Sequence, residues 1–238
     1  MSHKKEWNIL FLLFDYIEVL DFSGSFDVFS MANVPIPPKP GEKPNYDQGH
    51  VFKLHTVSEL GETITALHGL KIEPDYSFET CPNDIMDVLI IPGASPVFIK
   101  ELIEKKPQLV AWVAERLKDI PIVASVCVGA LILAKAGGFN GLQCTTHHAA
   151  IADLNAILQA EKANATVIPG VRYVDNSDTK NPRILSSAGV SAGIDQAFYM
   201  LREILGNATL ASSTATIMEY NETYNRMYSK VIPVPWNC

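Results

Sequence analysis

Short apolar runs alternate with segments of helical spacing along most of the chain. The run NILFLLF (8–14) is apolar on both faces, and residues 22–32 then place Phe22, Phe26 and Phe29 on one side of a helix. The same alternation continues downstream. It predicts strands over 51–57, 87–91, 121–126, 171–174 and 183–186, and helices over 95–118 (broken near Pro107), 129–136, 149–159, 191–205 and 208–219. Because strands that are apolar throughout need cover on both faces, the pattern predicts a mostly parallel sheet between two helical layers.

Length and composition set the scale of this α/β fold. With 238 residues, 47% of them hydrophobic, we expect one domain over 1–238 rather than two. Residues 33–46 (NVPIPPKPGEKPNY) are proline-rich, so they cannot form a helix or a central strand and are expected to be a surface loop. The loop is either a lid or interface arm, or an insertion without a role.

Charge and cysteine content narrow the class of protein. The chain has 19 basic and 26 acidic residues, and a net charge of −7 argues against nucleic acid or an anionic membrane as partner. Four scattered cysteines without a CxxC pair favour a reduced, cytoplasmic protein and give no metal-ligand spacing. No phosphate-binding loop is evident, and the first apolar stretch is too short for a signal peptide or a membrane span. We expect no metal and no cofactor.

Cys127 is the strongest candidate for chemistry. In PIVASVCVGA it stands between a predicted strand and a predicted helix, a position typical of a nucleophile elbow. The free N–H groups of the helix would favour a thiolate there and lower the thiol pKa below its usual value of about 8.5. The alternative is an inert buried cysteine. Cys81, Cys144 and Cys238 have no comparable setting.

Two further stretches could support a nucleophile. The turn Pro92-Gly93-Ala94 follows another predicted strand, and backbone N–H groups of Gly93, Ala94 and Val128 could stabilise a developing negative charge. Three carboxylates, Asp15, Glu18 and Asp21, follow the first strand. Spacing alone does not choose an acid among them, and Asp21 could equally be a helix cap.

Four stretches, spread over nearly the whole chain, resemble the DJ-1/PfpI superfamily. They are FLLFDYIEVLDFSGSFDVF, IPGA, VASVCVGALILAKAG, and TTHHAAI followed by LSSAGVSAGIDQAFYMLREILG. The resemblance implies a flavodoxin-like α/β sandwich and a homodimer. The form of the first turn is similar to that of isocyanide hydratases and of the amidotransferase-like domains of AraC-type regulators. By similarity to the hydratases, Cys127 is the expected nucleophile and Asp21 the general acid/base, with Gly24 and His147 at the substrate pocket.

The chain departs from the hydratase pattern at three places. Val128 stands where a threonine commonly follows the nucleophile, Ala94 stands where a second glycine is usual, and His147 could tune the thiolate, bind substrate or be structural. We expect hydration of a small electrophile, with an isocyanide converted to an N-substituted formamide. The alternatives are glyoxalase-like conversion of methylglyoxal to lactate, and a ligand or redox sensor that uses Cys127. Because the chain ends at Cys238, a fused DNA-binding regulator is not expected.

Overall fold

A seven-stranded sheet forms the centre of the molecule. The computed structural model describes residues 6–33, 51–82, 86–176 and 182–221. The strand order is β10-β11-β7-β6-β1-β2-β5, and every pair is parallel except β10 with β11. The strands are β1 (Glu6–Leu12), β2 (Val51–Ser58), β5 (Tyr76–Ser77), β6 (Val88–Ile91), β7 (Ile122–Ser125), β10 (Tyr173–Asp175) and β11 (Arg183–Ser187). The predicted mostly parallel sheet is confirmed.

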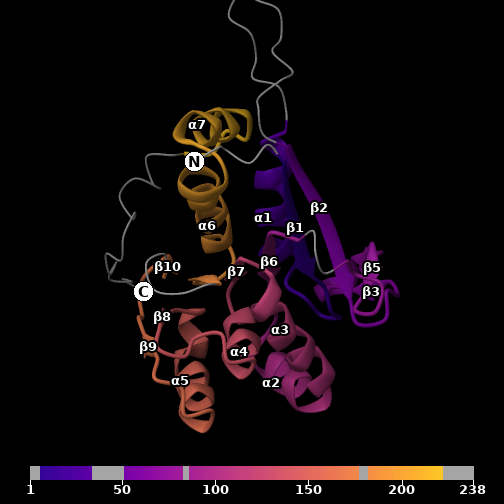
Figure 1. Cartoon of the computed structure of the whole chain (residues 1–238), viewed down its shortest axis with the longest axis vertical. Helices are drawn as coiled ribbons and strands as arrows, with labels where there is room; N and C mark the ends of the chain where they lie inside the picture. Colours follow the sequence, from indigo (N-terminus) through magenta and orange to yellow (C-terminus); the bar gives the residue numbers. More distant parts are fainter. Residues whose placement is uncertain (1–5, 34–50, 83–85, 177–181, 222–238) are drawn as a thin grey trace, which may run out of the picture.

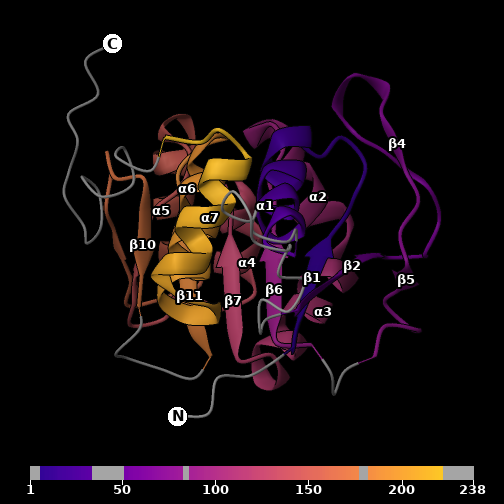
Figure 2. The same ribbon diagram turned by 90° about the horizontal axis from the view of Figure 1, so that it is seen from above.

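Helices cover both faces of this sheet, as Figures 1 and 2 show. One layer contains α1 (Val19–Met31), α6 (Ala192–Met200) and α7 (Ala208–Ile217). The other contains α2 (Pro96–Lys105), α3 (Pro107–Asp119), α4 (Gly129–Lys135) and α5 (Ile151–Ala160). The sheet between them is buried on both sides, which explains why Ile9–Leu12 and Val88–Ile91 carry no polar side chains.

The predicted elements are present, with shifted ends. The predicted break of the long helix near Pro107 is confirmed, because proline ends α2 and begins α3. Sequence reasoning missed five strands of two residues each, which are too short to show a period. They are β5, at the edge of the main sheet, and two separate pairs: β3 (Ile64–Thr65) with β4 (Lys71–Ile72), and β8 (Gln143–Cys144) with β9 (Thr166–Val167). The proline-rich loop predicted over 33–46 lies, apart from Asn33, outside the described residues.

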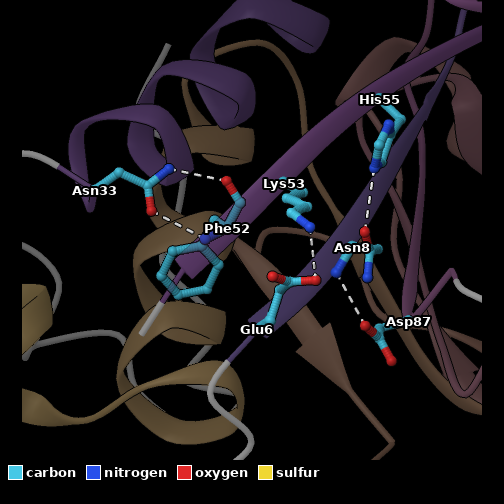
Figure 3. A network of polar contacts seen from close by, with 7 residues as sticks. All are labelled: Glu6, Asn8, Asn33, Phe52, Lys53, His55 and Asp87. Carbon is cyan, nitrogen blue, oxygen red and sulfur yellow. Dashed lines mark hydrogen bonds and ion pairs between the residues drawn. The ribbon is translucent and has the colours of Figure 1, made fainter. Parts of the chain in front are cut away.

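Polar contacts fix the amino ends of β1 and β2, at the edge of the sheet opposite the carboxyl ends (Figure 3). The Asn33 amide donates to and accepts from the backbone of Phe52, at 2.8 and 2.9 Å, which ties the end of α1 to β2. The Asn8 N–H donates to Asp87 Oδ2 at 2.9 Å, and His55 Nε2 lies 3.2 Å from Asn8 Oδ1. These contacts hold the amino ends of the two strands in place and lie at the opposite edge of the sheet from the carboxyl ends.

Within the described ranges, no helix is both long enough and apolar enough to cross a lipid bilayer.

Candidate active site

The candidate site lies where four neighbouring strands end. β1, β6, β7 and β11 are adjacent in the sheet, and their carboxyl ends lead to Asp21, Gly93, Cys127 and Val190, respectively. In an open parallel sheet this edge is the usual place for a ligand site, because the loops after the strands converge there. The fold therefore brings together three residues that the sequence singled out and one that it did not.

Cys127 occupies a strained turn between β7 and α4. Its φ of 56° is uncommon for a residue with a side chain. The turn is held because the Cys127 N–H donates to Ala188 O at 3.2 Å and the Thr146 hydroxyl donates to Cys127 O at 2.8 Å. Gly129 follows as the first residue of α4, and a Cβ there would lie 2.2 Å from Ile91 O. The predicted elbow geometry is thus present, and Cys127 is 4% exposed.

Asp21 reaches the same place from the first turn of α1. The helix begins at Val19, so Asp21 lies inside it and does not cap it. The Gly93 N–H donates to Asp21 Oδ2 at 3.1 Å, and the Glu18 N–H donates to Gly93 O at 2.8 Å. A Cβ on Gly93 would lie 2.7 Å from the Val128 N and 2.9 Å from Asp21 Oδ2. Glycine is therefore required here, and its N–H, expected to face an oxyanion, is bonded to the carboxyl of Asp21.

The two side chains share a buried environment and perturb each other. Burial raises the pKa of Asp21 to about 7, although hydrogen bonds from Cys127 and Gly93 act in the opposite direction. Burial also raises the pKa of the Cys127 thiol, and the charge of Asp21 raises it further. The predicted lowering of the thiol pKa is therefore wrong: desolvation and a neighbouring carboxylate outweigh the backbone N–H groups at the start of α4. At neutral pH the thiol therefore keeps its proton, and the carboxyl of Asp21 is close to half protonated.

Val190 is the residue that sequence reasoning missed. Backbone hydrogen bonds from Val190 lower the pKa of both Asp21 and Cys127. Val190 has a φ of 47°, which is strained for a β-branched residue. This backbone conformation directs the Val190 N–H toward Asp21 and Cys127. The closely spaced glycines of SSAGVSAG signalled a tight turn near the pocket, but a pattern of glycines does not show which N–H faces the sulfur.

One oxygen of Asp21 has no assigned partner. Asp21 is fully buried, and among the described residues no hydrogen-bonding group meets its Oδ1 in standard geometry. An unpaired buried carboxyl oxygen is costly, so it marks the place where this site stores unfavourable free energy.

His147 lies against the turn that carries Val190, and its expected place at a substrate pocket stays a prediction. Its ring packs on Gly189, where a Cβ would lie 2.1 Å from His147 Cδ2, and its Nδ1 accepts from the Ala149 N–H at 3.2 Å. Burial lowers the pKa of His147, and His148 lowers it further. His147 is not among the groups that shift the pKa of Cys127, which gives no support to a role in tuning the thiolate. It lines a cavity of about 210 Å³ together with the Ala188–Val190 turn.

The remaining candidates take different places. Gly24 lies on α1 against α6, where a Cβ would be 2.8 Å from Ile194 Cγ1, so its smallness serves helix packing. Asp15 points away, with its Oδ1 accepting from the Thr65 N–H at 2.8 Å. The Glu18 side chain acts on Asp21 through its charge, which raises the pKa of that carboxyl, and the Glu18 carbonyl accepts from the Asp21 N–H at 3.1 Å. Ala94 is buried at the turn, and the role expected for its backbone stays a prediction.

Comparisons with known proteins identify the family of this chain. The model of the DJ-1/PfpI family matches residues 7–204. The chain is 29% identical over 196 residues to an isonitrile hydratase from Pseudomonas putida, a match that covers 82% of this chain and 71% of that protein. It is 25% identical to the HTH-type transcriptional regulator GbdR from Pseudomonas aeruginosa, over 98% of this chain and 56% of the regulator.

A solved structure supports the fold assignment. A ThiJ/PfpI family protein from Pseudomonas syringae superposes with a TM-score of 0.71 at 23% sequence identity, over 98% of this chain and 79% of that protein. Because the family model spans most of the chain, from β1 into the π-helical turn Leu201–Leu205 that follows α6, the assignment does not depend on one motif. This chain belongs to the DJ-1/PfpI family.

Proposed function

We propose that this protein adds water to a small electrophilic carbon, converting an isocyanide to an N-substituted formamide. The observation that carries the proposal is the pairing of a buried thiol with a buried carboxyl of pKa about 7, Cys127 with Asp21. A group that titrates near neutrality can accept and return a proton within one turnover. The 29% identity to an isonitrile hydratase points to the same chemistry.

The first step forms a carbon–sulfur bond. Because the thiol of Cys127 has a raised pKa, it needs a base, and the ionised carboxyl of Asp21 removes its proton as sulfur attacks the terminal carbon of R–N≡C. Asp21 then delivers this proton to the same carbon. The product is a thioimidate, R–N=CH–S–Cys, and the carboxylate is regenerated.

The second step adds water and releases sulfur. Asp21 takes a proton from water as the oxygen attacks the thioimidate carbon, and the nitrogen receives that proton. The resulting R–NH–CH(OH)–S–Cys collapses: the carbon–sulfur bond breaks, the hydroxyl proton returns to sulfur and R–NH–CHO leaves. No oxidant or reductant enters, and the thiol and carboxylate are restored.

Backbone groups support the sulfur through both steps. The N–H groups of Val128 and Val190 lower the pKa of Cys127, so they stabilise negative charge on sulfur when it attacks and when it leaves. Gly93 holds Asp21 Oδ2, which leaves Oδ1 as the oxygen for proton transfer. Val128 offers no hydroxyl next to the sulfur, so in this proposal Asp21 alone handles the proton.

The test is turnover of p-nitrophenyl isocyanide, followed by absorbance and by identification of the formamide. We expect turnover in the wild type, and a loss of at least about a thousandfold in Cys127→Ala and in Asp21→Asn. Cys81→Ala is the matched control, because Cys81 is also a buried thiol with a raised pKa but has no carboxyl partner among the groups that shift it. No formamide from a folded wild type would overturn the proposal for this substrate, and methylglyoxal would then be tested for conversion to lactate.

A second candidate is ligand sensing, and the match to the regulator over 98% of this chain favours it. Sensing by peroxide is less well supported, because the thiolate is the reactive form and burial raises the pKa of Cys127. Binding of an isocyanide without turnover, with Cys127 unmodified, would favour the sensor.

The homodimer and the cytoplasmic location stay predictions. Sedimentation velocity on the purified protein measures its oligomeric state. A monomer at every concentration would contradict the homodimer.

A further inference from the structure

A second cavity lies away from the candidate active site. It has a volume of about 290 Å³ and is placed at the carboxyl ends of β1 and β2, between the loop that leads to β3 and the outer surface of α2. None of its lining residues is Cys127, Asp21 or a group that shifts the pKa of either. Any role for this cavity is therefore separate from the proposed chemistry and does not rest on it.

The floor of the cavity is apolar. Leu13, Ile64, Leu102 and Leu109 line it and are each less than a tenth exposed. Leu60 lines it too, yet it is 66% exposed. A large aliphatic side chain left in solvent beside an apolar hollow gains from an apolar ligand that covers both.

Aromatic rings form one wall. Phe98 lies between two others, with its ring centroid 6.5 Å from that of Phe14 and 5.0 Å from that of Tyr16. Tyr16 lines the cavity, is 56% exposed and has a φ of 61°. Exposed ring faces attract a cation through the ring quadrupole.

The charge at the rim is negative on balance. Four carboxylates line the cavity against two ammonium groups, Lys105 and Lys106. Both lysines are already paired: Lys105 lies 2.8 Å from Glu101 Oε2, and Lys106 lies 2.5 Å from Glu59 Oε2. The surplus falls on Asp15 and Glu62.

We propose that this cavity binds a small amphiphilic amine, with its apolar body on the leucine floor and its ammonium group between the aromatic wall and Glu62. The volume accepts a ligand of about ten heavy atoms. An anion is disfavoured, because the two lysines that could meet it are held by glutamates. The structure thus assigns a ligand class to a site outside the thiol–carboxyl pair.

The test titrates the full chain with 3-phenylpropylamine and follows backbone amides by nitrogen-15 NMR. We expect saturable shifts at Tyr16, Glu62, Thr63 and Glu101, with a dissociation constant on the order of 1 mM for a ligand of this size. 3-Phenylpropionate and 3-phenylpropanol share the apolar body and are expected to bind at least about fivefold more weakly. The same titration on Cys127→Ala keeps the result independent of the proposed hydration, because that variant is expected to bind the amine normally.

Two variants locate the site. Thr63→Trp places a large ring at the exposed rim and is expected to weaken binding more than tenfold. Glu62→Gln is expected to weaken it about two- to fivefold, and Glu104→Gln, on α2 but outside the lining, is expected to leave it unchanged. Absence of saturable shifts, equal affinity for the carboxylate, or binding unaffected by Thr63→Trp in a folded protein would each overturn the proposal.

Discussion

Two buried carboxylates occupy matching places in this molecule and have opposite surroundings. Asp21 lies in the first turn of α1 and Asp195 in the first turn of α6, and these two helices pack against each other. Asp195 accepts from Arg172 Nε at 2.5 Å and from the Tyr220 hydroxyl, so both its oxygens are bonded. Asp21 meets a thiol and the peptide N–H groups of Gly93 and Val190, and no cation of the described residues is among the groups that shift its pKa.

The contrast separates a structural carboxylate from a chemical one. A buried carboxylate with an arginine keeps its charge without a large free-energy penalty, and it fixes how the helix is seated. A buried carboxylate without one is destabilised as an anion, and its pKa rises toward the pH at which proton transfer is useful. The fold can supply a counterion at this depth, as Arg172 shows, but within the part of the chain that the structure describes no cation is among the groups that act on Asp21.

The largest expected effect is on turnover, where removing the Asp21 carboxylate and removing the Asp195 carboxylate are expected to differ most. Asp21→Asn keeps an acceptor for the Gly93 N–H but removes the exchangeable proton, so we expect turnover of p-nitrophenyl isocyanide to fall by about a thousandfold or more. Asp195→Asn is expected to stay within about tenfold, because Asp195 has no contact with the thiol. Initial rates at one pH, with both variants checked for folding by circular dichroism, decide this. Equal losses would contradict the separation of roles.

The next effect concerns stability. Arg172→Met leaves the Asp195 charge buried without its cation, and we expect the free energy of unfolding to fall by about 3–5 kcal/mol. Arg202→Met, at a partly buried position on the following helical turn, is expected to change it by less than about 1 kcal/mol. Urea unfolding followed by fluorescence measures both. Equal changes in the two variants would mean that the Arg172–Asp195 ion pair does not contribute specifically to the free energy of unfolding.

Replacing Asp21, in contrast, is expected to raise the free energy of unfolding. The folded-state pKa of Asp21 is about 7 against an ordinary 3.8, so the folded protein binds the extra proton between these values. Stability therefore falls as pH rises from about 4 to about 7, and the loss persists above 7. Asp21→Asn is expected to stabilise the protein by roughly 2–4 kcal/mol at pH 8 and by little at pH 4. Urea unfolding at the two pH values tests the sign, and a destabilised variant at pH 8 would contradict the assignment.

The sequence predicted much of this fold and part of the site. Apolar runs and helical spacing predicted the sheet and its layers, and the strand–cysteine–helix pattern predicted the elbow at Cys127, because both depend on local order. Neither the raised thiol pKa nor the N–H of Val190 was predicted. Both depend on segments more than sixty residues apart meeting at one edge of the sheet, and on burial that no local pattern reports. For the same reason Asp195 and its arginine did not stand out.

The pH profile of turnover sharpens the assignment of Asp21. The reactive state holds one proton on the pair, whether the proton is drawn on sulfur or on the carboxyl, so both descriptions give the same profile. We expect kcat/KM to rise with pH and level off above about 7, with about a hundredfold difference between pH 5 and 8 after the uncatalysed rate is subtracted. The residual activity of Asp21→Asn is expected to lose this step. A wild-type profile that is flat from pH 5 to 8 would exclude a proton transfer through Asp21.

The smallest expected effect is that of His147, and it tests whether the site extends beyond Cys127 and Asp21. His147 lines the cavity beside Val190, and its Nδ1 accepts from the Ala149 N–H, so at neutral pH its proton is on Nε2, which can donate to a substrate. His147→Asn keeps an acceptor for Ala149 and removes the ring. If His147 only binds substrate, KM rises by up to about tenfold while kcat stays the same. His68→Asn, at an exposed position outside this cavity, is the control. A fall in kcat with KM unchanged would place His147 in proton transfer, and the contrast between Asp21 and Asp195 would then describe only half of the chemistry.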